Sequence, residues 1–227
     1  MSYLTDEIAS QPGCWARAIE MAGSAGAALP GPGERVAAIG CGSSLNVARC
    51  YAALREIAGQ GQTDAFPASE VPATRRYDRL VYISRTGTTT EVLDALRAAP
   101  RDAPATAITA EADAPLAREA RHVVLLDFAD ERSVVSSRFI TSSIVLLRAQ
   151  LGTDVRSLPA EAEREAARRE LLERRHLFCE VERVVQRHSR RLRRRLRQAQ
   201  ARRDRTLMPS THTADSTPHD SELDWAQ

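Results

Sequence analysis

Three short segments of the sequence combine hydroxyl side chains with glycine or arginine, and each directly precedes or enters a helical pattern. They cover residues 40–44, 84–90 and 131–138. The first backbone N–H groups of a helix have no partner within the helix, and the helix dipole adds positive potential there. Hydroxyl groups can donate hydrogen bonds to phosphate oxygens, and Gly87 would let the backbone approach a ligand closely. These residue types therefore favour the binding of a phosphate dianion.

The same serines and threonines have an alternative, structural explanation, because they are preferred residues at helix N-caps. A single segment of this kind would favour capping, whereas three segments on one side of a sheet favour a ligand site. The sequence contains neither G-x-x-x-x-G-K-[ST] nor G-x-G-x-x-G, so it indicates neither a P-loop nor a dinucleotide site. All 32 basic residues are arginines, which excludes a lysine Schiff base.

Apolar stretches that indicate buried strands alternate with helical patterns and place the three segments between them. The expected strands cover residues 35–39, 64–67, 79–84, 103–109 and 122–126. The expected helices cover residues 14–28, 45–58, 91–98, 116–120 and 135–151. Uninterrupted apolar strands that alternate with helices are typical of a parallel sheet covered on both faces. We therefore expect an α/β fold with a flavodoxin-like, doubly wound, five-stranded parallel sheet, which binds ligands at the carboxyl ends of its strands.

The composition changes along the chain and predicts four regions. Residues 1–33 form an N-terminal helical segment, and residues 34–155 form the sheet domain with the phosphate site. Residues 156–205 are rich in Arg and Glu and predict a helical segment, whereas the polar tail at residues 206–227 predicts disorder. Residues 187–205 lack interleaved aromatic residues, so we do not expect nucleic-acid binding. A basic interaction protein that uses this segment stays an alternative.

Composition also bears on compartment and cofactors. No apolar run reaches the roughly 18 residues of a membrane span, and the first residues lack the basic region and apolar core of a signal peptide. The four cysteines form no C-x-x-C pair and no cluster with histidine, so we expect reduced thiols and no metal site. We therefore expect a cytoplasmic protein without membrane contact and without a cofactor.

Further motifs occur in a fixed order within the first two thirds of the chain. They are E-I-x-x-Q-P at residues 7–12, Gly-Cys-Gly-Ser-Ser at 40–44, Ser-Glu at 69–70, Ser-Arg-Thr-Gly-Thr-Thr at 84–89 and the segment 131–141. In these motifs the sequence resembles the SIS (sugar isomerase) domain family. The resembling branch includes the isomerase domain of glucosamine-6-phosphate synthase and related sugar-phosphate isomerases and deaminases. The resemblance implies the SIS fold, a phosphosugar ligand and self-association, for example as a homodimer.

The resemblance also implies which residues contact the phosphosugar: Cys41, Gly42, Ser43, Ser44, Ser84, Arg85, Thr86, Gly87, Thr89, Val134, Val135 and Ser136. Of these, Ser84, Thr86 and Thr89 would form the phosphate cradle, and the last three would line the sugar side. Arg85 replaces the usual Gln of the family and could strengthen anion binding through a charge-assisted bond. Glu131 would orient its loop.

The resemblance leaves the catalytic residues unknown. Enzymes of the synthase branch have two SIS subdomains, and their proton-transfer carboxylate and ring-opening histidine lie in or near the second one. No segment after residue 152 resembles that second subdomain. We therefore expect a phosphosugar-binding protein of aminosugar metabolism, derived from an aldose–ketose isomerase and truncated by a reading-frame change near Phe178. The alternatives are a genuine C-terminus of another kind, and a non-catalytic sugar-phosphate sensor or regulator.

Overall fold

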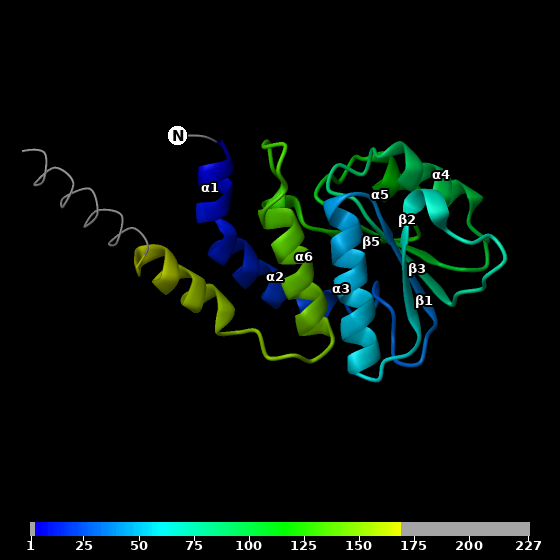
Figure 1. The fold of residues 1–227 in the computed structure, drawn as a ribbon, viewed down its shortest axis with the longest axis horizontal. Helices are drawn as coiled ribbons and strands as arrows, with labels where there is room; N and C mark the ends of the chain where they lie inside the picture. The colour runs from blue at the N-terminus through cyan, green and yellow to red at the C-terminus, as the bar shows by residue number, and fades with distance from the viewer. Residues whose placement is uncertain (1–2, 169–227) are drawn as a thin grey trace, which may run out of the picture. The chain divides into compact units, whose positions relative to one another are not determined.

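The computed structural model describes residues 3–168, and within them five strands form one sheet (Figure 1). The strands are β1 (Val36–Gly40), β2 (Thr63–Pro67), β3 (Arg79–Ile83), β4 (Ala105–Thr109) and β5 (His122–Leu125). Their order in the sheet is β2-β1-β3-β4-β5, and every neighbouring pair is parallel. This order confirms the flavodoxin-like doubly wound sheet predicted from the sequence.

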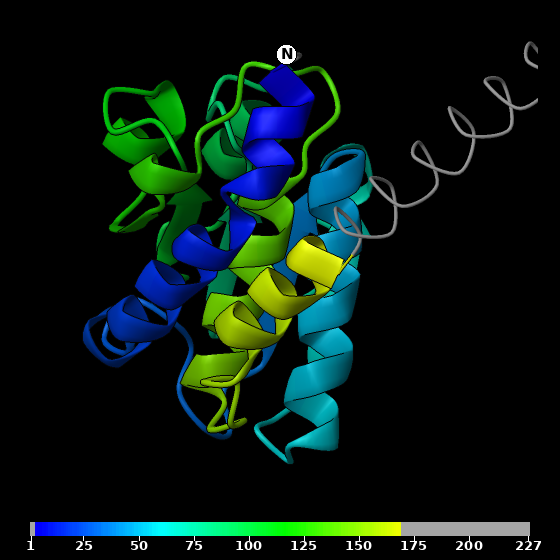
Figure 2. The same ribbon diagram turned by 90° about the vertical axis from the view of Figure 1, so that its left-hand side faces the viewer.

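Helices cover both faces of this sheet, because its inner strands are apolar on both sides. One face carries α2 (Gln11–Ala25), α3 (Ser43–Ile57) and α6 (Arg138–Gln150), and the other carries α4 (Thr90–Ala98) and α5 (Pro115–Glu119) (Figures 1 and 2). Successive strand residues alternate between the two cores, so Ala38 of β1 belongs to the first and Ile39 to the second. The result is a three-layer α/β/α arrangement.

Two further helical segments flank this core. A short helix, α1 (Tyr3–Ala9), precedes α2, and residues 158–168 are also helical. The latter agree with the helical prediction for the start of the arginine-rich segment. The rest of that segment, the predicted disordered tail and the proposed frame change near Phe178 lie outside the described residues. No helix in the described part of the chain is long and apolar enough to cross a membrane.

Two helix boundaries differ from the prediction where they affect the site. α3 begins at Ser43, two residues earlier than expected, because Gly42 turns the chain with a φ of 54°. α6 begins at Arg138, three residues later than expected. The residues before it form a loop, because the carboxylates of Glu7 and Glu131 hold their backbone N–H groups.

The three hydroxyl-rich segments lie at the carboxyl edge of the sheet. β1 and β3 are neighbours in the sheet, yet the β1–α3 loop leads to one face and the β3–α4 loop to the other. The two loops therefore diverge where the strand order reverses, which is where sheets of this type bind ligands. The third segment follows β5 and enters α6 from the same edge.

Candidate functional site

The β3–α4 loop, residues 84–89, brings hydroxyl side chains together before the start of α4. Ser84 is buried at the end of β3, and its Oγ lies 3.1 Å from Oγ1 of Thr89. The Gly87 N–H donates to the same Ser84 Oγ at 3.2 Å. Thr88 donates from its Oγ1 to Oγ1 of Thr86 at 2.9 Å. The loop thus contains two pairs of hydroxyl groups that can redirect hydrogen bonds to an anion.

The start of α4 has no side-chain cap in the described part of the chain. Thr89 has the extended conformation of an N-cap residue, with φ −61° and ψ 119°, but its hydroxyl pairs with Ser84 and caps nothing. The first N–H groups of α4 are therefore left without a side-chain acceptor. This geometry speaks against plain capping as the reason for the threonines in this loop.

Gly87 has a structural role that the sequence did not indicate. Its φ of 60° lies in the left-handed region that favours glycine. A Cβ at this position would lie 2.6 Å from Cβ of Ala114 and 3.3 Å from Cβ of Leu116. The Leu116 N–H also donates to the Gly87 carbonyl at 3.1 Å. Glycine is therefore required where the loop packs against the start of α5, whatever the ligand needs.

The β1–α3 loop lies on the other side of the switch point, the place between β1 and β3 where the strand order reverses. A Cβ on Gly40 would lie 2.8 Å from the carbonyl carbon of Ser44, so only glycine fits beneath the first turn of α3. Gly42 has open space around it and precedes the helix without any side chain to cap it. Cys41 is half-buried, Ser43 is exposed and Ser44 is buried. Ser43 is thus the more accessible of the two predicted serine ligands.

The third segment is occupied by a carboxylate of the protein itself. Glu131 is 2% exposed and lies at the start of α6. It accepts hydrogen bonds from the N–H and Oγ of Ser137 at 2.5 and 2.8 Å, from Arg138 N–H at 3.1 Å and from Phe139 N–H at 3.0 Å. An anionic group therefore already fills the position where the sequence suggested a phosphate. This contact set fits the loop-orienting role that the family resemblance implied for Glu131.

Glu7 of α1 holds the preceding turn of the same segment. Its carboxylate is 3% exposed and accepts hydrogen bonds from Arg132 N–H at 2.6 Å, from Ser133 N–H at 3.2 Å and from the Ser133 hydroxyl. Burial acts to raise the pKa of Glu7, but these hydrogen bonds and the charge of Arg138 together outweigh it and lower the pKa. Glu7 is therefore ionised at neutral pH and fixes the loop.

Residues 134–136, predicted to line the sugar side, belong to the part of this loop that neither glutamate holds. Val134 and Val135 are exposed, and Ser136 is half-buried. Within the described chain, no hydrogen bond joins these three residues to the β3–α4 loop. The structure thus brings Ser84 and Thr89 into contact, whereas no hydrogen bond among residues 3–168 joins the predicted sugar-side residues to them.

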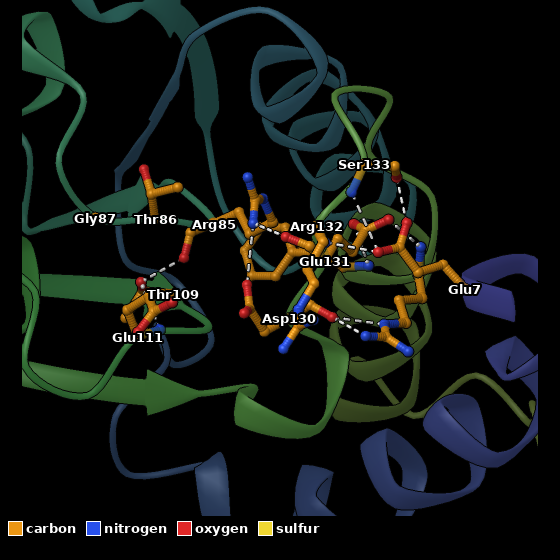
Figure 3. A network of polar contacts seen from close by, with 12 residues as sticks. Glu7, Arg85, Thr86, Gly87, Thr109, Glu111, Asp130, Glu131, Arg132 and Ser133 are labelled. Carbon is orange, nitrogen blue, oxygen red and sulfur yellow. Dashed lines mark hydrogen bonds and ion pairs between the residues drawn. The ribbon is translucent and has the colours of Figure 1, made fainter. Parts of the chain in front are cut away.

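Arg85 links the β3–α4 loop to the segment after β5 (Figure 3). Its guanidinium donates to Asp130 Oδ1 at 3.0 Å and to the carbonyl of Glu131. Thr109 is fully buried at the end of β4 and donates from Oγ1 to the Arg85 carbonyl at 2.9 Å. Sequence reasoning missed Thr109 and the pairing of Asp130 with Arg85. The available signal was a hydroxyl or an acid placed just after a strand at the carboxyl edge.

Several titratable side chains of the described residues are already engaged or lie at the other edge of the sheet, whereas the acids Glu91 and Glu111 are exposed beside these loops. Glu7 and Glu131 are engaged with backbone N–H groups, and Asp130 is engaged with an arginine. His122 is the only histidine between residues 3 and 168, and it begins β5 at the opposite, amino edge of the sheet. Burial, together with two nearby arginines, lowers its pKa. The same residues contain no group of three or more side chains that could hold a metal ion.

Two hollows in the described chain lie away from these loops. One, of about 540 Å³, is lined by residues of α2, α6 and the segment 152–156. The other, of about 960 Å³, lies between residues 68–78 and α4. The β2–β3 crossover, which lines the second hollow, contains a one-turn helix, η1 (Ala68–Glu70). None of the predicted ligand residues lines either hollow, so the anion site rests on loop geometry.

Comparison with solved structures gives the same fold. Glucosamine-6-phosphate deaminase from Thermotoga maritima matches with a TM-score of 0.58 and 24% identity, over 71% of this chain and 53% of that one. The C-terminal domain of glucosamine-fructose-6-phosphate aminotransferase from Francisella tularensis matches with a TM-score of 0.57 and 21% identity, over 77% and 53%. The sugar isomerase domain of an RpiR transcription factor from Sphaerobacter thermophilus matches with a TM-score of 0.50 and 23% identity, over 73% and 96%.

The first two of these matches show that the chain spans about half the length of those proteins. No curated protein sequence gives a significant match. The sequence model of one family, the SIS domain, matches residues 32–150, which is more than half of the chain. This range contains the whole sheet, both loops of the switch point and α6. The chain therefore belongs to the SIS domain family.

Proposed function

We propose that this protein binds a phosphosugar and places its phosphate at the β3–α4 loop. The observation that carries this proposal is the start of α4, where paired hydroxyls replace a side-chain cap. Uncapped N–H groups, a helix dipole and hydroxyl donors together are well suited to a phosphate dianion. The deaminase and the aminotransferase that are similar to this chain in fold are both named for sugar phosphates.

The β3–α4 loop would bind the phosphate of the ligand, and the β1–α3 loop would contact its sugar. Ser84, Thr86 and Thr89 would bind the phosphate, because their hydroxyls cluster before α4. Ser43, exposed on the neighbouring loop, would contact the sugar. Open space at Gly42 leaves room for a ligand to approach the backbone there. Residues 134–136 would complete the sugar side, contributed by the same copy of the chain or by a second one.

We propose binding without turnover, and an aminosugar phosphate as the ligand. Proton transfer between two carbons of an opened sugar needs a positioned acid and base. The carboxylates of Glu7 and Glu131 are buried and accept hydrogen bonds from the backbone. The one described histidine lies at the other edge of the sheet. Incubation with fructose 6-phosphate or glucosamine 6-phosphate tests this point. Robust isomerisation or deamination by the purified protein would contradict it.

Binding itself is tested by calorimetric titration with glucosamine 6-phosphate, fructose 6-phosphate, glucose and inorganic phosphate. The phosphorylated sugars are expected to bind and to raise the melting temperature, whereas glucose is not. Thr86→Ala should weaken binding because it removes a hydroxyl from the loop. Thr153→Ala, an exposed threonine after α6, is the matched control and should change nothing. Equal affinity of the two variants would contradict the assignment of the site.

A sensor or regulator is the second candidate. The chain covers 96% of the sugar isomerase domain of the RpiR transcription factor, against about half of the enzymes. A sensor needs ligand binding and a change in assembly, but no chemistry. Size-exclusion chromatography with and without glucosamine 6-phosphate tests for self-association. A change in elution volume with unchanged ligand would favour this function over that of an enzyme.

A further inference from the structure

The backbone carbonyl and the guanidinium of Arg85 both form hydrogen bonds with loops other than its own. Its backbone carbonyl accepts hydrogen bonds from Thr109 Oγ1 and Ala110 N–H, both at 2.9 Å. Its guanidinium donates to Asp130 and to the carbonyl of Glu131. One residue thus connects the β3–α4 loop to the ends of β4 and β5. The link crosses three of the connections at the carboxyl edge of the sheet.

The guanidinium does not face the hydroxyl cluster of its own loop. Figure 3 shows the Arg85 side chain extending toward Asp130 and Glu131 and away from Thr86. Its charge is paired with Asp130 at 3.0 Å, and the side chains are 24% and 40% exposed. A phosphate bound by Ser84, Thr86 and Thr89 would not need to break this pair.

The segment that receives Arg85 is itself held firmly. Arg138 donates from Nε to the Asp130 carbonyl at 2.6 Å, and the Glu131 carboxylate binds the start of α6. Glu7 fixes the next two residues through their N–H groups. We call the contacts of the Arg85 guanidinium with Asp130 and the Glu131 carbonyl the Arg85 strap. Because residues 130–133 are themselves held by hydrogen bonds, the strap can restrain the β3–α4 loop.

We propose that Arg85 is a positioning residue for the phosphate site and makes no contact with the phosphate. By binding Asp130 and the Glu131 carbonyl, it holds residues 84–89 in the conformation that gathers the hydroxyls of Ser84 and Thr89. A loop ordered before the ligand arrives loses less entropy on binding. The inference rests on the proposed function for its ligand, but the strap itself exists without one.

The sign of one substitution separates this role from direct binding. If Arg85 bound the anion, Asp130→Asn would free its charge and remove a repelling carboxylate, so affinity would rise. If Arg85 positions the loop, Asp130→Asn loosens the strap and affinity falls. We therefore measure the dissociation constants of inorganic phosphate and fructose 6-phosphate for wild type, Arg85→Gln, Asp130→Asn and the double variant. Each single variant should bind roughly fivefold to tenfold more weakly, and the double variant no more weakly than either.

Both side-chain contacts of Arg85 come from one nitrogen, Nη1, and an ammonium group also has donors for two acceptors. Arg85→Lys keeps the cation on a shorter side chain and should therefore recover part of the affinity lost in Arg85→Gln. Tighter binding by Asp130→Asn, or additive losses in the double variant, would overturn the proposal. If Arg85→Gln does not fold, Asp130→Asn decides alone, since that side chain is partly exposed.

A measurement without ligand keeps the two proposals distinguishable. The Gly87 N–H, which donates to Ser84, reports on the order of the loop through its hydrogen exchange. Exchange at Gly87 should be roughly fivefold to tenfold faster in Arg85→Gln and Asp130→Asn, with β1 amides unchanged as the internal control. If wild type binds no phosphate compound, the proposed function fails while this comparison still tests the strap. Unchanged exchange in both variants would refute the strap even if the ligand binds.

Discussion

The starts of α4 and α6 have similar sequences, but only the start of α6 binds a carboxylate of the protein itself. Both helices follow a segment rich in hydroxyl side chains at the same edge of the sheet. At α6 the Glu131 carboxylate occupies the first turn and accepts four hydrogen bonds. At α4 no described carboxylate does so, and the hydroxyls of Ser84 and Thr89 bind each other. The two starts therefore differ in whether the protein supplies the anion itself.

Loop length accounts for this difference. Glu131 precedes Ser137 by six residues, which lets the chain turn back and place the carboxylate beneath the helix. The β3–α4 loop is pinned by Gly87 against α5, and its first-turn acid, Glu91, is exposed. A helix start filled by its own carboxylate gains stability, whereas an unfilled start keeps its capacity for a ligand. Mutations at the start of α6 should therefore affect mainly stability, and mutations at the start of α4 should affect mainly ligand binding.

The largest effect is expected for Glu131→Ala. It would leave three backbone N–H groups at the start of α6 without this acceptor, and the one of Phe139 is buried, so the free energy of unfolding should fall by about 3 kcal/mol. Urea unfolding measures this loss. Glu91→Ala, which removes the acid from the first turn of α4, is the matched control and should cost no more than about 0.5 kcal/mol. Similar losses in both variants would erase the difference between the two helix starts.

Gly87→Ala should rank next. The added Cβ would meet Ala114 at 2.6 Å and would sit at a φ of 60°, so the free energy of unfolding should fall by roughly 2 kcal/mol. Gly42→Ala has a similar φ of 54° but no atom within 4 Å of the new Cβ. Its ψ of −124° lies outside the left-handed helical region, so the backbone conformation alone should cost about 1 kcal/mol or more, with no added steric contact. The difference between their melting curves isolates the packing of the β3–α4 loop on α5, and equal losses would count against that packing.

The sheet and its order were predictable, because buried apolar strands that alternate with helices leave few arrangements. The position of the hydroxyl-rich loops at the carboxyl edge of the sheet was also predictable. The family resemblance implied a loop-orienting role for Glu131, but its hydrogen bonds to the first turn of α6 were not predictable, since the sequence places this acid before the helix. Thr109 was missed as well, because a threonine that ends a strand has no distinctive pattern until the Arg85 carbonyl is seen beside it. Contacts between distant loops decided what local sequence could not.

A smaller effect is expected from pH at Glu7. Its pKa is lowered in the folded protein, because the hydrogen bonds of Ser133 and Arg132 outweigh the opposing effect of burial. The stability that its ionised form contributes is therefore fully present above the ordinary value of about 4.5 and is lost as the pH falls through the lowered pKa. Chemical unfolding from pH 7 to pH 3 should show wild type more stable than Glu7→Gln at pH 7, with a gap that narrows under acid. A gap that stays constant would show that the charge of Glu7 contributes nothing to holding the loop.

The smallest change in stability is expected for Thr89→Ala. Its hydroxyl is paired only with Ser84 and caps no helix in the described chain, so the free energy of unfolding should change by less than about 0.5 kcal/mol. Phosphate affinity should fall roughly tenfold, because a donor beside α4 is lost. Ser137→Ala at α6 removes a hydroxyl bonded to Glu131 at 2.8 Å and should do the reverse, costing about 1 kcal/mol with unchanged affinity. Calorimetric titration and urea unfolding of both variants give four numbers. The comparison is supported only if Thr89→Ala weakens binding without loss of stability and Ser137→Ala lowers stability without loss of binding. That result would show that α6 binds a carboxylate of the protein, whereas α4 binds the anion of a ligand.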